Sequence, residues 1–193
     1  KTLRVNKHKD LIVKGNKVIV FIELNTDKIP DEMEYYNGQI TAVRVPTPYT
    51  TMDNACLYCN SNLRTVFLGK TITKLVSDCL AGFSNINKIF IGSDKAPALD
   101  PADGTGYTFR ATRSGGYVQG KNCTIYGVKG SSSSYHVDST DPWQWDGCIK
   151  ADVTSDRDND NRNIPAMNEN IKTWKIDTDT YESGKELETF KAE

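Results

Sequence analysis

Two stretches of this chain align with each other without a gap, at a constant offset of 23 residues. Residues 54–69 read NACLYCNSNLRTVFLG, and residues 77–92 read SDCLAGFSNINKIFIG. The aligned pairs share size and polarity: Cys56 with Cys79, Leu57 with Leu80, Leu63 with Ile86, Val66 with Ile89, Leu68 with Ile91, and Gly69 with Gly92. A repeat of roughly 20–29 residues predicts a stacked solenoid, in which each unit covers the apolar face of its neighbour. Such chains usually work by presenting a surface, so recognition is favoured over catalysis.

Each repeat contains a short run in which inward and outward positions alternate, as expected of a β-strand. Val43, Val66 and Ile89 occupy equivalent inward positions at the same offset. The aliphatic L-x-x-V-x-L spacing is typical of leucine-rich repeats. The register supports three units over roughly 40–92 and a degenerate fourth over roughly 17–39. A terminal unit is expected to be atypical because no neighbour covers one of its faces.

The segments that flank the repeats differ from them. Two apolar runs, 11–13 and 18–22, are separated by a Gly-Asn pair, which predicts a β-hairpin at the N-terminal end of the stack. The period stops at Gly92. Trp143 and Trp145 lie close together further on, which predicts a plug that covers the last unit.

We therefore predict a β-rich α/β fold, a short leucine-rich-repeat solenoid. Parallel strands would alternate with short helical or 3₁₀ turns, between the N-terminal hairpin and a C-terminal cap. Residues 1–150 would form this body, with an insertion at 93–121. Residues 151–193 would form a polar loop and a C-terminal tail or strand that packs back on the body.

Bulk composition excludes some partners. The net charge is −1 and the basic residues are scattered, so we expect no nucleic-acid partner. The longest apolar run, 18–22, is too short to span a bilayer. The chain begins at Lys1, which predicts a mature or trimmed fragment from which a signal or lipid anchor was removed.

Five cysteines are present, an odd and sparse set that does not indicate a disulfide scaffold. Cys56 and Cys59 form one CxxC pair with no second pair, so no zinc site, and no cofactor, is predicted. Cys56 and Cys79 share an inward position and are interpreted as small buried hydrophobic residues. Whether Cys123 pairs with Cys148 is left open.

The repeat frame I-x-x-x-A-F-x-x-C-x-x-L-x-x-V-x-L resembles the BspA-type leucine-rich repeats of bacterial surface proteins. Two copies fit it: Met52, Cys56, Leu57, Leu63, Val66 and Leu68 in one, and Leu75, Cys79, Leu80, Ile86, Ile89 and Ile91 in the next. The run TIYGVKGS at 124–131, followed by Tyr135 and Trp143, resembles the closing phrase of many members. The resemblance implies a secreted or outer-surface protein that binds rather than catalyses, and it carries over no catalytic residues.

The first candidate binding surface is the central outward position of each strand: Phe21, Arg44, Phe67 and Phe90. Neighbouring strands lie about 4.8 Å apart, so these side chains would form one column. Exposed aromatic rings beside an arginine are typical of interface anchors. The alternative is that another part of this chain covers the column, for instance residues 93–121 or 171–190.

The second candidate is the 93–121 insertion, because long irregular segments often carry function. Its aromatic and basic side chains would contact a protein or glycan: Tyr107, Phe109, Arg110, Arg113 and Tyr117. The alternative is a wrap that seals the end of the solenoid.

An acidic segment offers a third, weaker pattern. Asp156, Asp158 and Asp160 are spaced like the start of a calcium loop. The sixth position is Asn161 instead of Gly, and the twelfth is Met167 instead of Glu. A solvated acidic loop is therefore the preferred interpretation, with calcium as the alternative.

Taken together, these patterns predict a non-enzymatic, extracellular or cell-surface module that recognises a protein or glycan and is a monomer by default. One alternative is a structural spacer or cap within a larger surface protein. A second is a hydrolase with its site in the insertion, although no nucleophile elbow is present.

Overall fold

The structure is a computed structural model, which describes residues 8–14, 17–22, 40–45, 49–52, 62–76, 79–80, 82–100, 120–135, 145, 170 and 173–185. For 8–14 and 17–22 it describes the path of the backbone.

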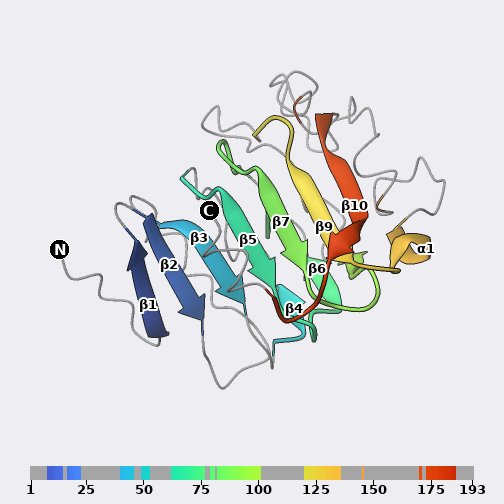
Figure 1. The fold of residues 1–193 in the computed structure, drawn as a ribbon, viewed down its shortest axis with the longest axis horizontal. Coiled ribbons are helices and arrows are strands. Elements are labelled where there is room, and N and C mark those ends of the chain that lie inside the picture. Colours follow the sequence, from blue (N-terminus) through green and yellow to red (C-terminus); the bar gives the residue numbers. More distant parts are fainter. Residues whose placement is uncertain are drawn as a thin grey trace, which may run out of the picture.

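Most of the strands belong to one seven-stranded sheet, which we call the long sheet (Figure 1). Its strands, in spatial order, are β1 (His8–Lys14), β2 (Lys17–Ile22), β3 (Ile40–Val45), β5 (Thr65–Leu68), β7 (Lys88–Ile91), β9 (Thr124–Val128) and β10 (Lys175–Tyr181). β1 and β2 form the predicted antiparallel hairpin, and every later pairing in this sheet is parallel.

A short second sheet is made of β4 (Thr51–Met52), β6 (Lys74–Val76) and β8 (Ala98–Asp100), all parallel. Its strands alternate along the chain with β3, β5 and β7 of the long sheet. The one helix among the described residues is α1 (Ser132–Tyr135). The protein therefore has an α/β fold with mostly parallel strands in two sheets and little helix.

Strand pairing confirms the 23-residue alignment. Val43 lies opposite Val66, and Val66 lies opposite Ile89. In the short sheet, Met52 lies opposite Leu75, at the same offset. The long sheet continues past the repeats, because Ile89 lies opposite Ile125 on β9. Like residues are thus in register across strands that are distant in sequence.

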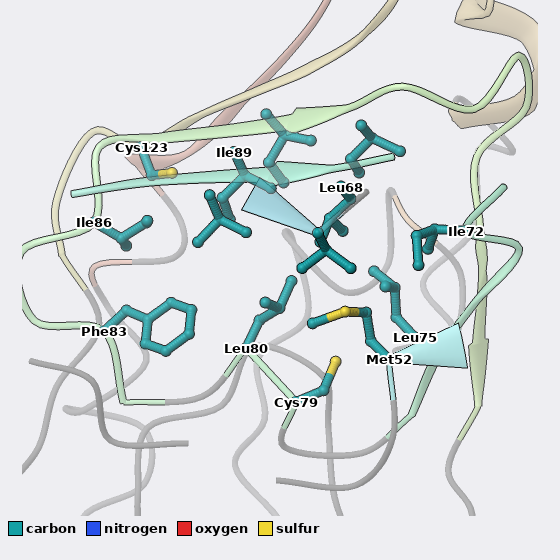
Figure 2. Close-up of a cluster of buried hydrophobic side chains, with 14 of the residues drawn as sticks. Met52, Leu68, Ile72, Leu75, Cys79, Leu80, Phe83, Ile86, Ile89 and Cys123 are labelled. Carbon is teal, nitrogen blue, oxygen red and sulfur yellow. The ribbon is translucent and has the colours of Figure 1, made fainter. Parts of the chain in front are cut away.

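The core lies between the two sheets (Figure 2). Leu68 and Ile89 reach it from the long sheet, and Met52 and Leu75 reach it from the short sheet. All four side chains are at most 1 % exposed. Burying an aliphatic side chain of this size stabilises a fold by about 1.5–3 kcal/mol. One isolated unit could not bury these side chains, so the in-register stacking itself produces the core.

Two tryptophans close the core at the end beyond the repeats. The Trp145 indole N–H donates to the Pro97 carbonyl at 2.8 Å, and the Trp174 indole N–H donates to the Gly120 carbonyl at 2.8 Å. Both rings are buried, with their only polar atom hydrogen-bonded. Trp145 of the predicted tryptophan pair is therefore part of the buried core, while Trp143 lies outside the described residues.

Cys79 and Cys123 are buried in the core, and Cys123 is a free thiol. This confirms the interpretation of Cys79 as a small core residue. Cys56, Cys59 and Cys148 lie outside the described residues. Because Cys123 is a free thiol, the structure has no disulfide between Cys123 and Cys148.

A glycine interrupts the inward aliphatic column at β9. Gly127 pairs with Ile91, and the Tyr135 ring from α1 fills the space beside it. A Cβ atom on Gly127 would lie 2.6 Å from Tyr135 Cε2 and 3.0 Å from Ser131 Oγ. The tyrosine thus takes the place that the side chain of a fourth aliphatic residue would occupy.

We expect Gly127→Ala to destabilise the protein by about 1–3 kcal/mol, because the added methyl overpacks the Tyr135 ring. Chemical denaturation measures this loss. The loss should shrink in a Tyr135→Leu background, where the ring is gone. An unchanged free energy of unfolding for Gly127→Ala would contradict the packing described.

Alkaline pH should destabilise the fold. Burial raises the pKa values of the Cys123 thiol and the Tyr135 phenol well above their ordinary values of 9.0 and 10.0. Above pH 9 the unfolded chain loses the thiol proton while the native chain keeps it, so stability falls as pH rises. Each group adds a slope of about 1.4 kcal/mol per pH unit above its ordinary pKa.

Urea denaturation at pH 8, 9.5 and 10.5 measures this fall. Cys123→Ala should make the slope above pH 9 shallower than in the wild-type protein. A flat profile in the wild-type protein would contradict the burial of both groups.

Candidate functional site

The outer face of the long sheet carries the predicted column. Arg44 pairs with Phe67, and Phe67 pairs with Phe90. The column then continues to Tyr126 on β9, because Tyr126 pairs with Phe90. At its other end, the backbone of Phe21 pairs with that of Arg44. The structure therefore brings together the four positions that the repeat register predicted, and adds Tyr126.

Three rings of this column form a continuous stack. Phe67 and Phe90 have ring centroids 4.6 Å apart and planes 11° apart. Phe90 and Tyr126 have centroids 4.7 Å apart and planes 12° apart. These spacings match the separation of hydrogen-bonded strands, about 4.7–4.9 Å. The strand register thus sets the stacking distance.

The expectation that Phe67 and Phe90 are exposed anchors is wrong. Their side chains are only 1 % and 5 % exposed. Tyr181, at the end of β10, packs its ring against Phe90 with centroids 5.1 Å apart and planes 65° apart. A segment within 171–190 therefore covers the column at Phe90, which is the alternative that the sequence left open. The physical reason is that moving aromatic rings out of water stabilises the folded protein.

A β-bulge places Tyr181 over the column. The pairing of β10 with β9 shifts between Asp177, opposite Tyr126, and Tyr181, opposite Val128. In an unbroken register, Asp179 would lie opposite Val128 instead. The bulge therefore brings a tyrosine to a position where regular pairing would bring an aspartate.

Side-chain and backbone hydrogen bonds hold this bulge. The Asp177 carboxylate accepts from the Asp179 and Thr180 N–H groups at 2.9 and 3.2 Å, and from the Thr180 hydroxyl at 3.0 Å. The Lys129 N–H donates to the Tyr181 carbonyl at 2.8 Å. Beyond the strand, the Ser183 hydroxyl donates to the Gly92 carbonyl at 3.2 Å. The covering segment is thus attached to the sheet at several points.

A pocket of about 380 Å³ opens between this covering segment and the sheet. Its lining comes from β7, β9, β10 and the turn that follows β10: Lys88, Phe90, Tyr126, Thr180, Tyr181, Glu182 and Lys185. Tyr126, the last ring of the stack, is partly exposed here. The pocket therefore combines aromatic walls with charged and hydroxyl groups.

The charged groups of the rim are linked. Lys185 forms an ion pair with Glu182. The hydrogen bond from Lys185, together with its positive charge and the charge of Lys129, lowers the pKa of Glu182. Glu182 is therefore ionised at neutral pH. Among the described residues, the pocket lining contributes two ammonium groups and one carboxylate.

Other predicted site residues lie outside the described part of the chain: Tyr107, Phe109, Arg110, Arg113 and Tyr117 of the insertion, the Phe21 side chain, and Asp156, Asp158 and Asp160 of the acidic segment. Within the described residues, no group of three His, Cys, Asp or Glu side chains is placed to hold a metal ion.

Sequence reasoning missed most of the pocket. Tyr126 could have been found, because it is the outward residue of a strand-like run at 124–128. Tyr181 could not, because its position depends on the bulge. Lys88, Glu182 and Lys185 come from segments that meet only in the folded chain.

No helix in the described residues is long and apolar enough to cross a membrane. Comparison of the chain with protein-family models, with curated proteins and with solved structures gives no match.

Proposed function

We propose that this chain is a short leucine-rich-repeat solenoid of BspA-like type that recognises a protein or glycan outside the cell. On this proposal it binds and does not catalyse, and it is secreted or held at the cell surface. The solenoid interpretation is supported by strands that alternate between the two sheets while like residues stay in register across β3, β5 and β7.

One observation carries the assignment of the binding site. The stack of Phe67, Phe90 and Tyr126 ends in a partly exposed ring at the pocket, beside lysine and glutamate side chains. Ligand sites typically pair apolar walls with a few polar groups that fix orientation, and their volumes start near 300 Å³. The pocket meets both criteria, so it replaces the exposed aromatic column as the proposed contact surface.

Rigidity also favours this site. Phe67 and Phe90 are buried and packed in the sheet, so Tyr126 rests on a support that does not need to reorganise on binding. A preorganised surface loses less conformational entropy when a ligand binds.

The test is an array of glycans and synthetic peptides probed with the purified protein and with Tyr126→Ala. We expect Tyr126→Ala to weaken binding of the recognised ligand at least tenfold, because the partly exposed ring of the pocket wall is lost. Tyr126→Phe, which keeps the ring, should retain most of the binding. Thermal melting of each variant checks that the fold is intact.

Two outcomes would count against the proposal. Binding that is equal in Tyr126→Ala and the wild-type protein would place the contact surface elsewhere. The absence of any ligand on the array would favour the alternative, a module that spaces or caps other domains.

A further inference from the structure

We propose that Asn122 is the acceptor of an N-linked glycan, added when the chain passes through an export route that carries an oligosaccharyltransferase. The inference rests on the extracellular location in the proposed function, and it does not depend on the pocket. Residues 122–124 read Asn-Cys-Thr, which fits the acceptor sequence Asn-X-Ser/Thr with X other than proline. This pattern occurs once in the chain, so the inference concerns a single residue.

The acceptor sequence lies at the surface, where β9 begins. Asn122 is exposed and belongs to a bend immediately before the strand. Its φ of 58° is in the left-handed region, which asparagine adopts more readily than most other residues. The Asn122 N–H donates to the Thr173 hydroxyl at 2.7 Å, so a backbone hydrogen bond holds the bend. A sugar on the side chain would leave this bond intact.

The three residues of the acceptor sequence differ in their burial. Cys123 is fully buried in the core, whereas Asn122 is exposed and Thr124 is partly exposed. Within the described residues, the Asn122 side chain makes no hydrogen bond that a glycan would break. The two groups that the transferase recognises, the amide and the hydroxyl two residues later, are therefore not part of the core. A bulky, hydrophilic glycan at this position would remain in solvent.

The transfer uses a lipid-linked oligosaccharide diphosphate as the second substrate. The side-chain nitrogen of Asn122 attacks C1 of the first sugar. A bond forms between this nitrogen and C1, and the bond between C1 and the diphosphate oxygen breaks. The lipid diphosphate leaves with the electron pair of the broken bond, and one amide proton passes to a base of the transferase. The product is a neutral, substituted amide, and no oxidant or reductant is needed.

The test is secretion of the full chain from cultured mammalian cells behind a cleavable signal peptide. Mass spectrometry before and after treatment with peptide-N-glycosidase F gives the glycan mass, and the enzyme converts a glycosylated asparagine to an aspartate. Asn122→Asp is the matched control, because aspartate also tolerates the left-handed backbone. Thr124→Val removes the recognised hydroxyl, and Thr124→Ser keeps it. The same measurement on the intracellular fraction covers any variant that folds poorly.

We expect the wild-type chain to carry one glycan at Asn122, and the enzyme-treated chain to match Asn122→Asp in mass. Thr124→Val should lose the glycan completely, whereas Thr124→Ser should retain it. The glycosylated and the enzyme-treated protein should have closely similar melting temperatures, because an exposed side chain carries the sugar.

Two results would overturn the inference. One is a wild-type chain that is secreted without a glycan. The other is a glycan that persists in Thr124→Val, which would mean that this acceptor sequence is not the one used. The outcome is separate from that of the proposed function. An unmodified chain that still binds its ligand on the array would reject the glycan and leave the recognition role standing, and a glycosylated chain that binds no ligand would do the reverse.

Discussion

Phe67→Ala is expected to lower the free energy of unfolding by about 3–5 kcal/mol, as much as a substitution in the inner core. Phe67 points to the outer face of the long sheet, yet its side chain is 1 % exposed and stacks on Phe90. Its removal leaves a cavity beside Phe90 and breaks the stack of aromatic rings. Leu68→Ala, on the inner face of the same strand, should cost about 2–5 kcal/mol.

Urea denaturation of the two variants side by side makes the comparison. Tyr126→Ala is the matched control, since Tyr126 belongs to the same stack but is partly exposed, and it should cost clearly less than Phe67→Ala. If Phe67→Ala costs less than about 1 kcal/mol while Leu68→Ala costs its full amount, the outer face is open to water and the covered column described above is wrong.

Trp145→Ala is expected to cost about 3–5 kcal/mol. The ring is 3 % exposed, packs edge-on against Tyr135 with centroids 5.0 Å apart, and donates its indole N–H to the Pro97 carbonyl. Its loss would open the end of the core and leave the carbonyl without this donor. Thermal or urea unfolding of the variant measures the effect.

Trp145→Phe separates the contribution of ring packing from that of the indole hydrogen bond. It keeps an aromatic ring and removes the hydrogen bond, so its cost should be the smaller part, near the ~1–3 kcal/mol of an unsatisfied buried polar group. A Trp145→Ala variant as stable as the wild-type protein would show that this ring does not close the core.

The sequence specified the strands of the long sheet within the repeats and their register, but not the short second sheet. The constant offset placed Val43, Val66 and Ile89 opposite one another, and the structure has that pairing. The hairpin before the repeats was also predictable. Strand register can be predicted from a sequence of this kind. A slip by one residue would turn every inward aliphatic side chain to the other face of the sheet, so the apolar pattern permits one register.

The candidate site was predictable only in part. Phe67 and Phe90 were correctly placed in one column, but the sequence could not decide whether water or another segment covers that column. The role of Gly127 could not be predicted from the repeat register either. The space beside Gly127 is filled by Tyr135, which comes from the following helix.

By itself, then, the sequence determined the periodic part of this protein, because the alternation of inward and outward residues and the constant repeat length can be observed directly in the order of the residues. Only the tertiary structure decided the pocket. A bulge beside Asp177 moved Tyr181 over Phe90, and Tyr126, Lys88 and Glu182 meet there from separate segments. The physical reason is that contacts between such segments depend on how the whole chain buries its apolar surface, which no single stretch of sequence records.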